Sequence, residues 1–180
     1  ITDQKGCFKD TSVTVLEPLL LVIDTTFQDS VSCNGLFDGS ASVVGSGGNG
    51  IYSYLWSDGQ STSTASNLTA GTYNVTITDQ KGCFKDTSVT VLEPDVLLIA
   101  SMSMDSASCN GVADGTATAN GITGGNGINS FSWNTTPVQT TNPAIALAAG
   151  NYTVTVTDQK GCFTTRDTTV LEPLLLVIDT

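Results

Sequence analysis

A long internal repeat is the feature that most constrains what this chain can fold into. Residues 2–18 read TDQKGCFKDTSVTVLEP, the same string returns unchanged at 78–94, and a diverged copy, TDQKGCFTTRDTTVLEP, occupies 157–173. A second string, LLLVIDT, occurs at 19–25 and again at 174–180. Self-similarity at a fixed spacing is the signature of a repeat protein whose units are copies of one structural module. Two slightly different units therefore alternate along the chain.

The repeats also define the predicted domain organisation. Complete units run over 19–94 and 95–173. Residues 1–18 match the end of a unit, so we expect them to form the C-terminal strand or strands of a preceding repeat. Residues 174–180 match the first strand of a following repeat. We therefore expect the chain to be part of a longer tandem array.

Each unit has the sequence pattern of an all-β module. Tyr73, Val75 and Ile77 alternate with polar residues, and β-branched residues are abundant throughout. Turn signals such as Asp-Gly and Gly-rich runs recur every 8–12 residues, and no helical period is present. The predicted strands of the first unit lie at 19–28, 39–46, 51–57, 61–68, 72–78 and 84–92.

Repeated aromatic residues indicate the kind of β-sandwich. Trp56 and Trp133 occupy the same position on the third predicted strand of each unit, while Tyr73 and Tyr152 follow an Ala-Gly turn. A buried Trp on the third strand and a Tyr that opens a later strand are typical of the immunoglobulin-like sandwich. We therefore predict tandem immunoglobulin-like (PKD-like) β-sandwich modules in a linear array, with these four residues as core anchors. An ordinary core role for both tyrosines is the alternative.

The composition argues against several classes of function. The chain has no His, which removes Ser-His-Asp and Cys-His catalysis and His-ligated zinc. With 17 acidic and 6 basic residues, the surface repels nucleic-acid phosphates. No apolar run reaches the roughly 18 residues that a membrane span requires. We predict no catalytic residues, no enzyme activity, no nucleic-acid partner and no membrane insertion.

The five cysteines follow the repeat. Each complete unit has one Cys in an SCNG motif and one in a KGCF motif. Paired cysteines without His or CxxC favour disulfides over metal binding, and disulfides indicate an oxidising, extracellular location. We predict that Cys33 pairs with Cys83 and that Cys109 pairs with Cys162. Cys7 would pair with a cysteine upstream of this chain.

This pairing depends on the number of strands between the two cysteines of a unit. Four strands between Cys33 and Cys83 would return the chain to the same end of the sandwich, which permits the bond because Cα atoms must lie within about 7 Å. An odd number would place the two cysteines at opposite ends. In that case Cys33 could bond Cys162 of the next unit. The spacing favours four strands and pairing within the unit.

Aspartates recur at equivalent loop positions and are the candidate metal ligands. They are Asp29, Asp38, Asp79, Asp105, Asp114 and Asp158. Several carboxylates that meet at one end of a sandwich could bind Ca²⁺ through oxygen ligands. Asp next to Gly is also a common turn pair, and we favour that structural role. Calcium is the one cofactor left possible, and no other cofactor is predicted.

Taken together, the motifs resemble a known repeat family. The first unit has SCNG at Ser32–Gly35, GGNG at Gly47–Gly50, Tyr54 before Trp56, and the run Leu68–Cys83, followed by Glu-Pro at its end. This combination resembles the SprB-type repeat of giant surface adhesins of gliding Bacteroidota. The resemblance implies type IX secretion, display at the cell surface, and a part in adhesion and gliding motility.

The predicted function is a structural stalk or spacer repeat of a large secreted adhesin. Its partners are the neighbouring repeats of the same chain, with surface glycans or lateral self-association into filaments as further possibilities. Two alternatives stay open at this point. The units could form a module that binds glycans or a host surface, or an accessory immunoglobulin-like domain of a secreted hydrolase.

Overall fold

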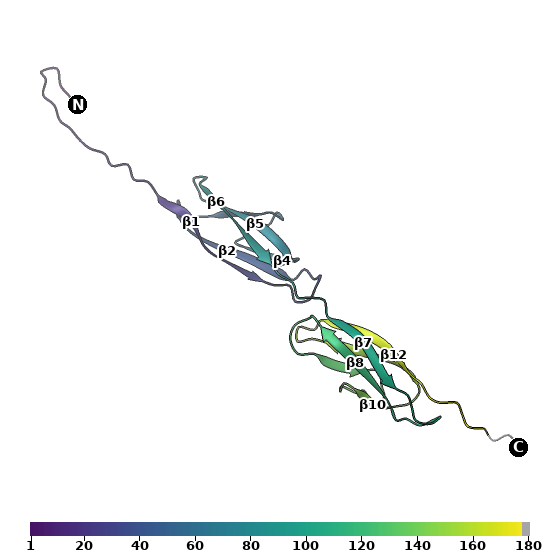
Figure 1. Cartoon of the computed structure of the whole chain (residues 1–180). Coiled ribbons are helices and arrows are strands. Elements are labelled where there is room, and N and C mark those ends of the chain that lie inside the picture. The colour runs from purple at the N-terminus through teal and green to yellow at the C-terminus, as the bar shows by residue number, and fades with distance from the viewer. Residues whose placement is uncertain (178–180) are drawn as a thin grey trace.

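The computed structural model describes residues 1–177 and contains two β-sandwich units placed end to end, with the termini at opposite ends (Figure 1). The strands of the first unit are β1 (Leu19–Asp29), β2 (Gly39–Gly48), β3 (Ser53–Trp56), β4 (Thr64–Leu68), β5 (Gly71–Thr78) and β6 (Phe84–Val91). Those of the second are β7 (Leu98–Asp105), β8 (Gly115–Thr123), β9 (Ser130–Trp133), β10 (Ala144–Leu147), β11 (Gly150–Thr157) and β12 (Phe163–Val170). Within 1–177 no helix could span a membrane.

Each unit consists of two three-stranded antiparallel sheets. The first unit has the strand orders β1-β2-β4 and β3-β5-β6, and the second repeats them as β7-β8-β10 and β9-β11-β12. Among the described residues, no strand of one unit pairs with a strand of the other. The architecture is therefore the all-β sandwich that the alternating pattern predicts.

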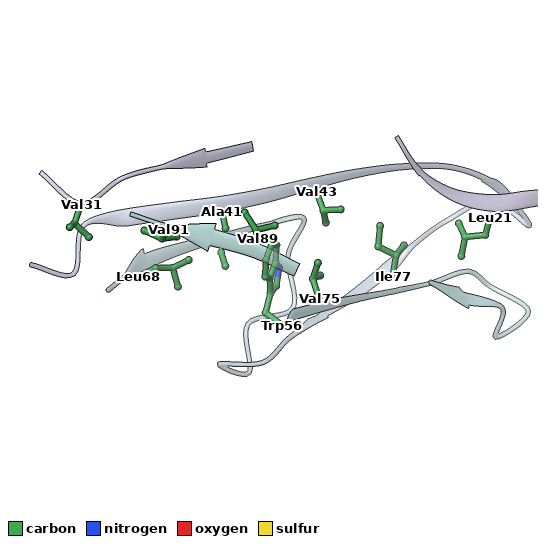
Figure 2. Close-up of a cluster of buried hydrophobic side chains, with 11 residues drawn as sticks. Leu21, Val31, Ala41, Val43, Trp56, Leu68, Val75, Ile77, Val89 and Val91 are labelled. Carbon is green, nitrogen blue, oxygen red and sulfur yellow. The ribbon is translucent and has the colours of Figure 1, made fainter. Parts of the chain in front are cut away.

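The alternation of apolar and polar residues determines which side chains enter the core. On β5, Val75 and Ile77 are 1% and 0% exposed, while the threonines beside them lie outside the core. Figure 2 shows these residues between the two sheets of the first unit, with Trp56 at the centre of the cluster. The second unit has a separate core around Trp133, and the two cores share no residue. Each unit thus buries its own apolar face.

The repeated aromatic residues have distinct roles. Trp56 and Trp133 are 2% and 1% exposed, and each indole nitrogen donates a hydrogen bond to a loop carbonyl oxygen, at 2.8 and 2.9 Å. Tyr73 and Tyr152 are half-buried. Their hydroxyls donate to carbonyl oxygens four residues upstream, at 3.1 and 3.0 Å. This is the contact of the tyrosine corner in immunoglobulin-like folds.

Two short strands determine which end of the sandwich each loop reaches. β3 begins at one end of the sandwich, where Ser53 lies opposite Thr78. β4 ends at the other end, where Leu68 lies opposite Gly39. Both strands run in the same direction, and the chain changes sheets between them. β3 and β4 together therefore make a single crossing of the sandwich, although they count as two strands.

The N-terminal segment lies outside both sandwiches (Figure 1). The predicted strands of a preceding repeat are absent from 1–18 except for an isolated bridge between Thr2 and Phe8. Between them, the Asp3 carboxylate accepts hydrogen bonds from the backbone nitrogens of Lys5 and Cys7, both at 2.9 Å. Residues 174–177 have no regular structure, and the rest of the predicted strand 174–180 falls outside the described residues.

Candidate functional site: the junction between the two units

The SCNG loop, Ser32–Gly35, lies at the end of the first unit that faces the second. Asp38 orders this loop, since its carboxylate accepts hydrogen bonds from the Ser32 hydroxyl and from the Ser32 backbone nitrogen, the latter at 2.9 Å. These bonds from Ser32 hold the pKa of Asp38 below its ordinary value. Asp114 and Ser108 form the equivalent pair in the second unit, with the same direction of pKa shift.

The SCNG loop also binds the segment through which the chain leaves the unit. The Asn34 side-chain amide donates to the Pro94 carbonyl oxygen at 3.0 Å, and the Gly35 backbone nitrogen donates to the Glu93 carboxylate at 2.9 Å. The SCNG loop of the second unit, Ser108–Gly111, makes the same contacts with its own Glu-Pro pair. Two motifs about 60 residues apart in sequence thus form one clamp on the linker to the next unit.

The KGC turn, Asp79–Cys83, lies at the opposite end of the first unit. Asp79 is 5% exposed, and one of its oxygens accepts hydrogen bonds from the backbone nitrogens of Lys81 and Cys83 at 2.8 and 3.0 Å. The other oxygen accepts from the backbone and side-chain nitrogens of Asn49, both at 2.8 Å. Burial disfavours the charged carboxylate, but these hydrogen bonds outweigh burial and lower the pKa of Asp79 to about 2.

The second unit has the same arrangement around Asp158, which accepts hydrogen bonds from Asn126, Lys160 and Cys162. The pKa of Asp158 is also lowered, since these bonds again outweigh burial. The glycine before each asparagine has a positive φ and no room for a side chain. A Cβ at Gly48 would lie 2.8 Å from Asp79 Oδ2, and the equivalent atom at Gly125 would lie 2.9 Å from Asp158 Oδ2. The GGNG motif is therefore required for the carboxylate to bind the loop.

The SCNG loop of the first unit and the KGC turn of the second, Asp158–Cys162, meet at the junction. A disulfide joins Cys33 to Cys162 over 129 residues of sequence, with the Cα atoms 5.6 Å apart. Beside it, the Asn126 side-chain amide donates a hydrogen bond of 2.8 Å to the Ser32 carbonyl oxygen. Leu36 and Phe163, one from each unit, line a groove next to the disulfide.

The predicted cysteine pairing is therefore wrong. Cys33 does not bond Cys83, and Cys109 does not bond Cys162; Cys7, Cys83 and Cys109 are exposed thiols. The expected four strands do separate Cys33 from Cys83. Because β3 and β4 share one crossing, however, the chain crosses the sandwich only three times, and the two cysteines lie at opposite ends. The alternative pairing of Cys33 with Cys162 is the one observed.

The candidate calcium ligands are distributed among separate turns and strand ends. Asp29 and Asp105 each accept a hydrogen bond from a hydroxyl on the neighbouring strand, at 3.2 and 2.9 Å. The other four candidates stabilise the SCNG loops and KGC turns described above. No three His, Cys, Asp or Glu side chains come together as a metal site within 1–177. The structural role favoured from the sequence stays the prediction for these residues, with calcium binding as its alternative.

Sequence reasoning gave no role to Asn49, Asn126 or the Glu-Pro pairs. These residues order the two ends of each unit, and Asn126 contacts the neighbouring unit directly. Their presence in each repeated motif was the available signal. The pattern alone indicates a set of turns, because it does not show that loops distant in sequence contact each other.

Residues 25–61 match the SprB repeat. The match extends from β1 past β3 and includes the SCNG and GGNG motifs, so it confirms the predicted resemblance. SprB repeats occur in cell-surface adhesins, which indicates a surface-adhesin type of repeat module and an extracellular location. A comparison with curated proteins found no match.

Similarity to a solved structure confirms the fold class. The chain is similar to the structure described as three N-terminal domains of the bacteriophage RB49 highly immunogenic outer capsid protein (Hoc). The TM-score is 0.50 at 17% identity, covering 85% of this chain and 59% of that chain. A second similar structure is described as Dpr11 IG1 bound to DIP-gamma IG+IG2, with a TM-score of 0.36 at 15% identity, covering 84% and 98% of the two chains.

Proposed function

We propose that the chain is a structural spacer in a large cell-surface adhesin. The observation that carries the proposal is the disulfide between Cys33 and Cys162, which joins the far end of one sandwich to the near end of the next. The units lie end to end, so the length of the pair is close to the sum of two sandwich lengths (Figure 1). Repetition of this arrangement would extend an adhesive part away from the cell.

Two covalent connections cross the junction. One is the backbone linker after Pro94, which the SCNG loop clamps through Asn34 and Gly35. The other is the junction disulfide. A single flexible linker allows bending and twisting, whereas two separate connections restrict both. The junction is therefore suited to a stiff stalk.

The SprB-type resemblance supports the finer parts of the proposal. It favours export by the type IX route and a role in surface adhesion and gliding. The disulfide is consistent with export, since disulfides persist in oxidising compartments. The net charge of −11 keeps neighbouring stalks apart, which favours individual spacers over lateral filaments.

Small-angle X-ray scattering of the oxidised and reduced chain tests the spacer role. A compact globule of 180 residues has a radius of gyration of about 16 Å. We expect the oxidised chain to exceed this value clearly and to show the distance distribution of a rod. Reduction, or the substitution Cys33→Ser, should broaden that distribution because the junction then bends. An oxidised chain near 16 Å would contradict the proposal.

A further inference from the structure

The KGC turn of the first unit matches the one that forms the junction disulfide. Asn126 Nδ2 lies 3.0 Å from Asp158 Oδ2 and 3.6 Å from Cys162 Sγ. At the first unit, Asn49 Nδ2 lies 2.8 Å from Asp79 Oδ2 and 3.9 Å from the Cys83 thiol. The turn at Cys83 therefore already has the conformation that Cys162 has in its disulfide.

The groove at the junction also has a counterpart at the free end of the first unit. At the junction, Val96 and Phe163 of the second unit form the groove with Leu36 of the first. At the free end, Leu20 and Phe84 line a groove beside Cys83. By position in the repeat, Leu20 corresponds to Val96 and Phe84 to Phe163. The residue that corresponds to Leu36 would come from another repeat.

The second unit has the counterpart of the Cys33 loop at the end that faces away from the first unit. Its SCNG loop contains Cys109, an exposed thiol, and binds its own exit segment as the Cys33 loop does. Gly35 and Gly111, which follow the two cysteines by two residues, have the same φ of 78°. The Cys109 loop therefore has the backbone conformation that Cys33 has when bonded.

We infer that Cys83 and Cys109 are the unbonded counterparts of Cys162 and Cys33, and that each forms a disulfide with a neighbouring repeat of the same kind. Cys109 would bond the KGC cysteine of a following repeat, and Cys83 the SCNG cysteine of a preceding one. The inference rests on the proposed function as a tandem spacer. A head-to-tail contact of this kind does not close on itself, so it generates an open array with one disulfide at each junction.

Formation of each bond requires an oxidant. Two thiols lose two protons and two electrons as the S–S bond forms, and a small-molecule disulfide such as oxidised glutathione accepts the electrons. One thiolate attacks that disulfide and releases one small thiol. The second thiolate then attacks the mixed disulfide, forms the protein disulfide and releases the other small thiol.

The repeat permits a direct test. Residues 174–180 have the same sequence as 19–25, so a copy of residues 26–94 appended after Thr180 completes a third unit in register. The extended chain carries Cys7→Ser and Cys83→Ser, so that the third unit's copy of Cys83 is the one cysteine left in that repeated sequence. It is folded with oxidised glutathione and mapped by mass spectrometry of non-reduced peptides. We expect a peptide that joins Cys109 to the third unit's copy of Cys83, together with the Cys33–Cys162 peptide.

The substitution Cys109→Ser is the matched control. It should leave the third unit's copy of Cys83 as a free thiol and the Cys33–Cys162 bond intact, with the circular dichroism spectrum unchanged. If Cys33–Cys162 forms while Cys109 stays a thiol or bonds elsewhere, the inference is overturned and the spacer proposal survives. If Cys33–Cys162 itself fails to form, the proposed function loses its supporting observation.

Discussion

Cys33 and Cys162 are 129 residues apart in sequence and belong to different sandwiches, yet a disulfide joins them. Each sandwich therefore has one cysteine at each end. The bond connects two units and does not link two cysteines of the same unit. Disulfides of small secreted domains commonly reinforce a single small core. Here the disulfide stabilises the junction between two units that have separate cores.

The substitution Cys33→Ser should make the junction more mobile without unfolding the units. The linker residues Leu92 and Val96 are about half exposed, at 55% and 50%, so loss of the disulfide makes this backbone accessible to proteases. Limited proteolysis followed by mass spectrometry should show faster cleavage within 92–97. Cys83→Ser, which removes an unbonded exposed thiol, is the matched control and should behave as the unsubstituted chain. Equal cleavage rates in all three proteins would count against the role of the disulfide.

Acid should weaken the fold in a defined window of pH. The pKa of Asp79 is lowered to about 2 in the folded state, from an ordinary value near 3.8. Its contribution to stability is therefore complete above about pH 4 and disappears as the pH falls toward 2. Thermal unfolding midpoints measured between pH 7 and 2 should show this decline.

The substitution Asp79→Asn removes this contribution at all pH values. We expect a lower midpoint at pH 7, since Asp79 accepts four hydrogen bonds, and a weaker dependence on pH. Asp10→Asn, in the exposed N-terminal segment, is the control and should leave the profile unchanged. A profile for Asp79→Asn with the unsubstituted slope would show that the carboxylate is not the titrating group.

The two cores should unfold as separate units. Trp56→Ala removes the largest buried side chain of the first core and should destabilise that unit by about 3–5 kcal/mol. Calorimetry of the reduced chain should then show one transition shifted and one unchanged. Trp133→Ala should shift the other transition. Equal shifts of both transitions would indicate one cooperative structure.

Calcium should have little effect on this fold. The candidate carboxylates accept hydrogen bonds in their own loops and do not converge within the described part of the chain. We expect the same unfolding midpoint with millimolar calcium and with a chelator. A calcium-dependent rise in the midpoint would show that a site forms, because a ligand stabilises the state that binds it.

The sequence predicted the strands well because alternation and turn residues are local signals. Val75 and Ile77 are buried as their spacing indicates, and the Asp-Gly and Gly-rich turns lie between strands. The cysteine pairing was predicted wrongly for a non-local reason. The number of strands equals the number of crossings only when every strand spans the sandwich, but the chain changes sheets between Trp56 and Thr64, halfway along it. No residue pattern in that stretch distinguishes two half-length strands from two full crossings.

The candidate site was only partly predictable for the same reason. The SCNG, GGNG and Glu-Pro motifs were visible as repeated strings. Their contacts join residues about 30 to 60 positions apart, such as Asn49 with Asp79 and Gly35 with Glu93. These pairings become apparent only when both ends of the sandwich are assembled.

Single-molecule extension of the oxidised chain, pulled from its two termini, tests the central claim most directly. The junction disulfide bypasses the chain between two cysteines that are 129 residues apart, so this part cannot extend while the bond is intact. We predict that reduction, or Cys33→Ser, adds about 450 Å of contour length in total, at roughly 3.5 Å per residue, shared between the separate unfolding steps of the two units. An added length of about 360 Å on reduction and only about 180 Å for Cys33→Ser, at the same length per residue and as expected for one disulfide within each unit, would contradict it.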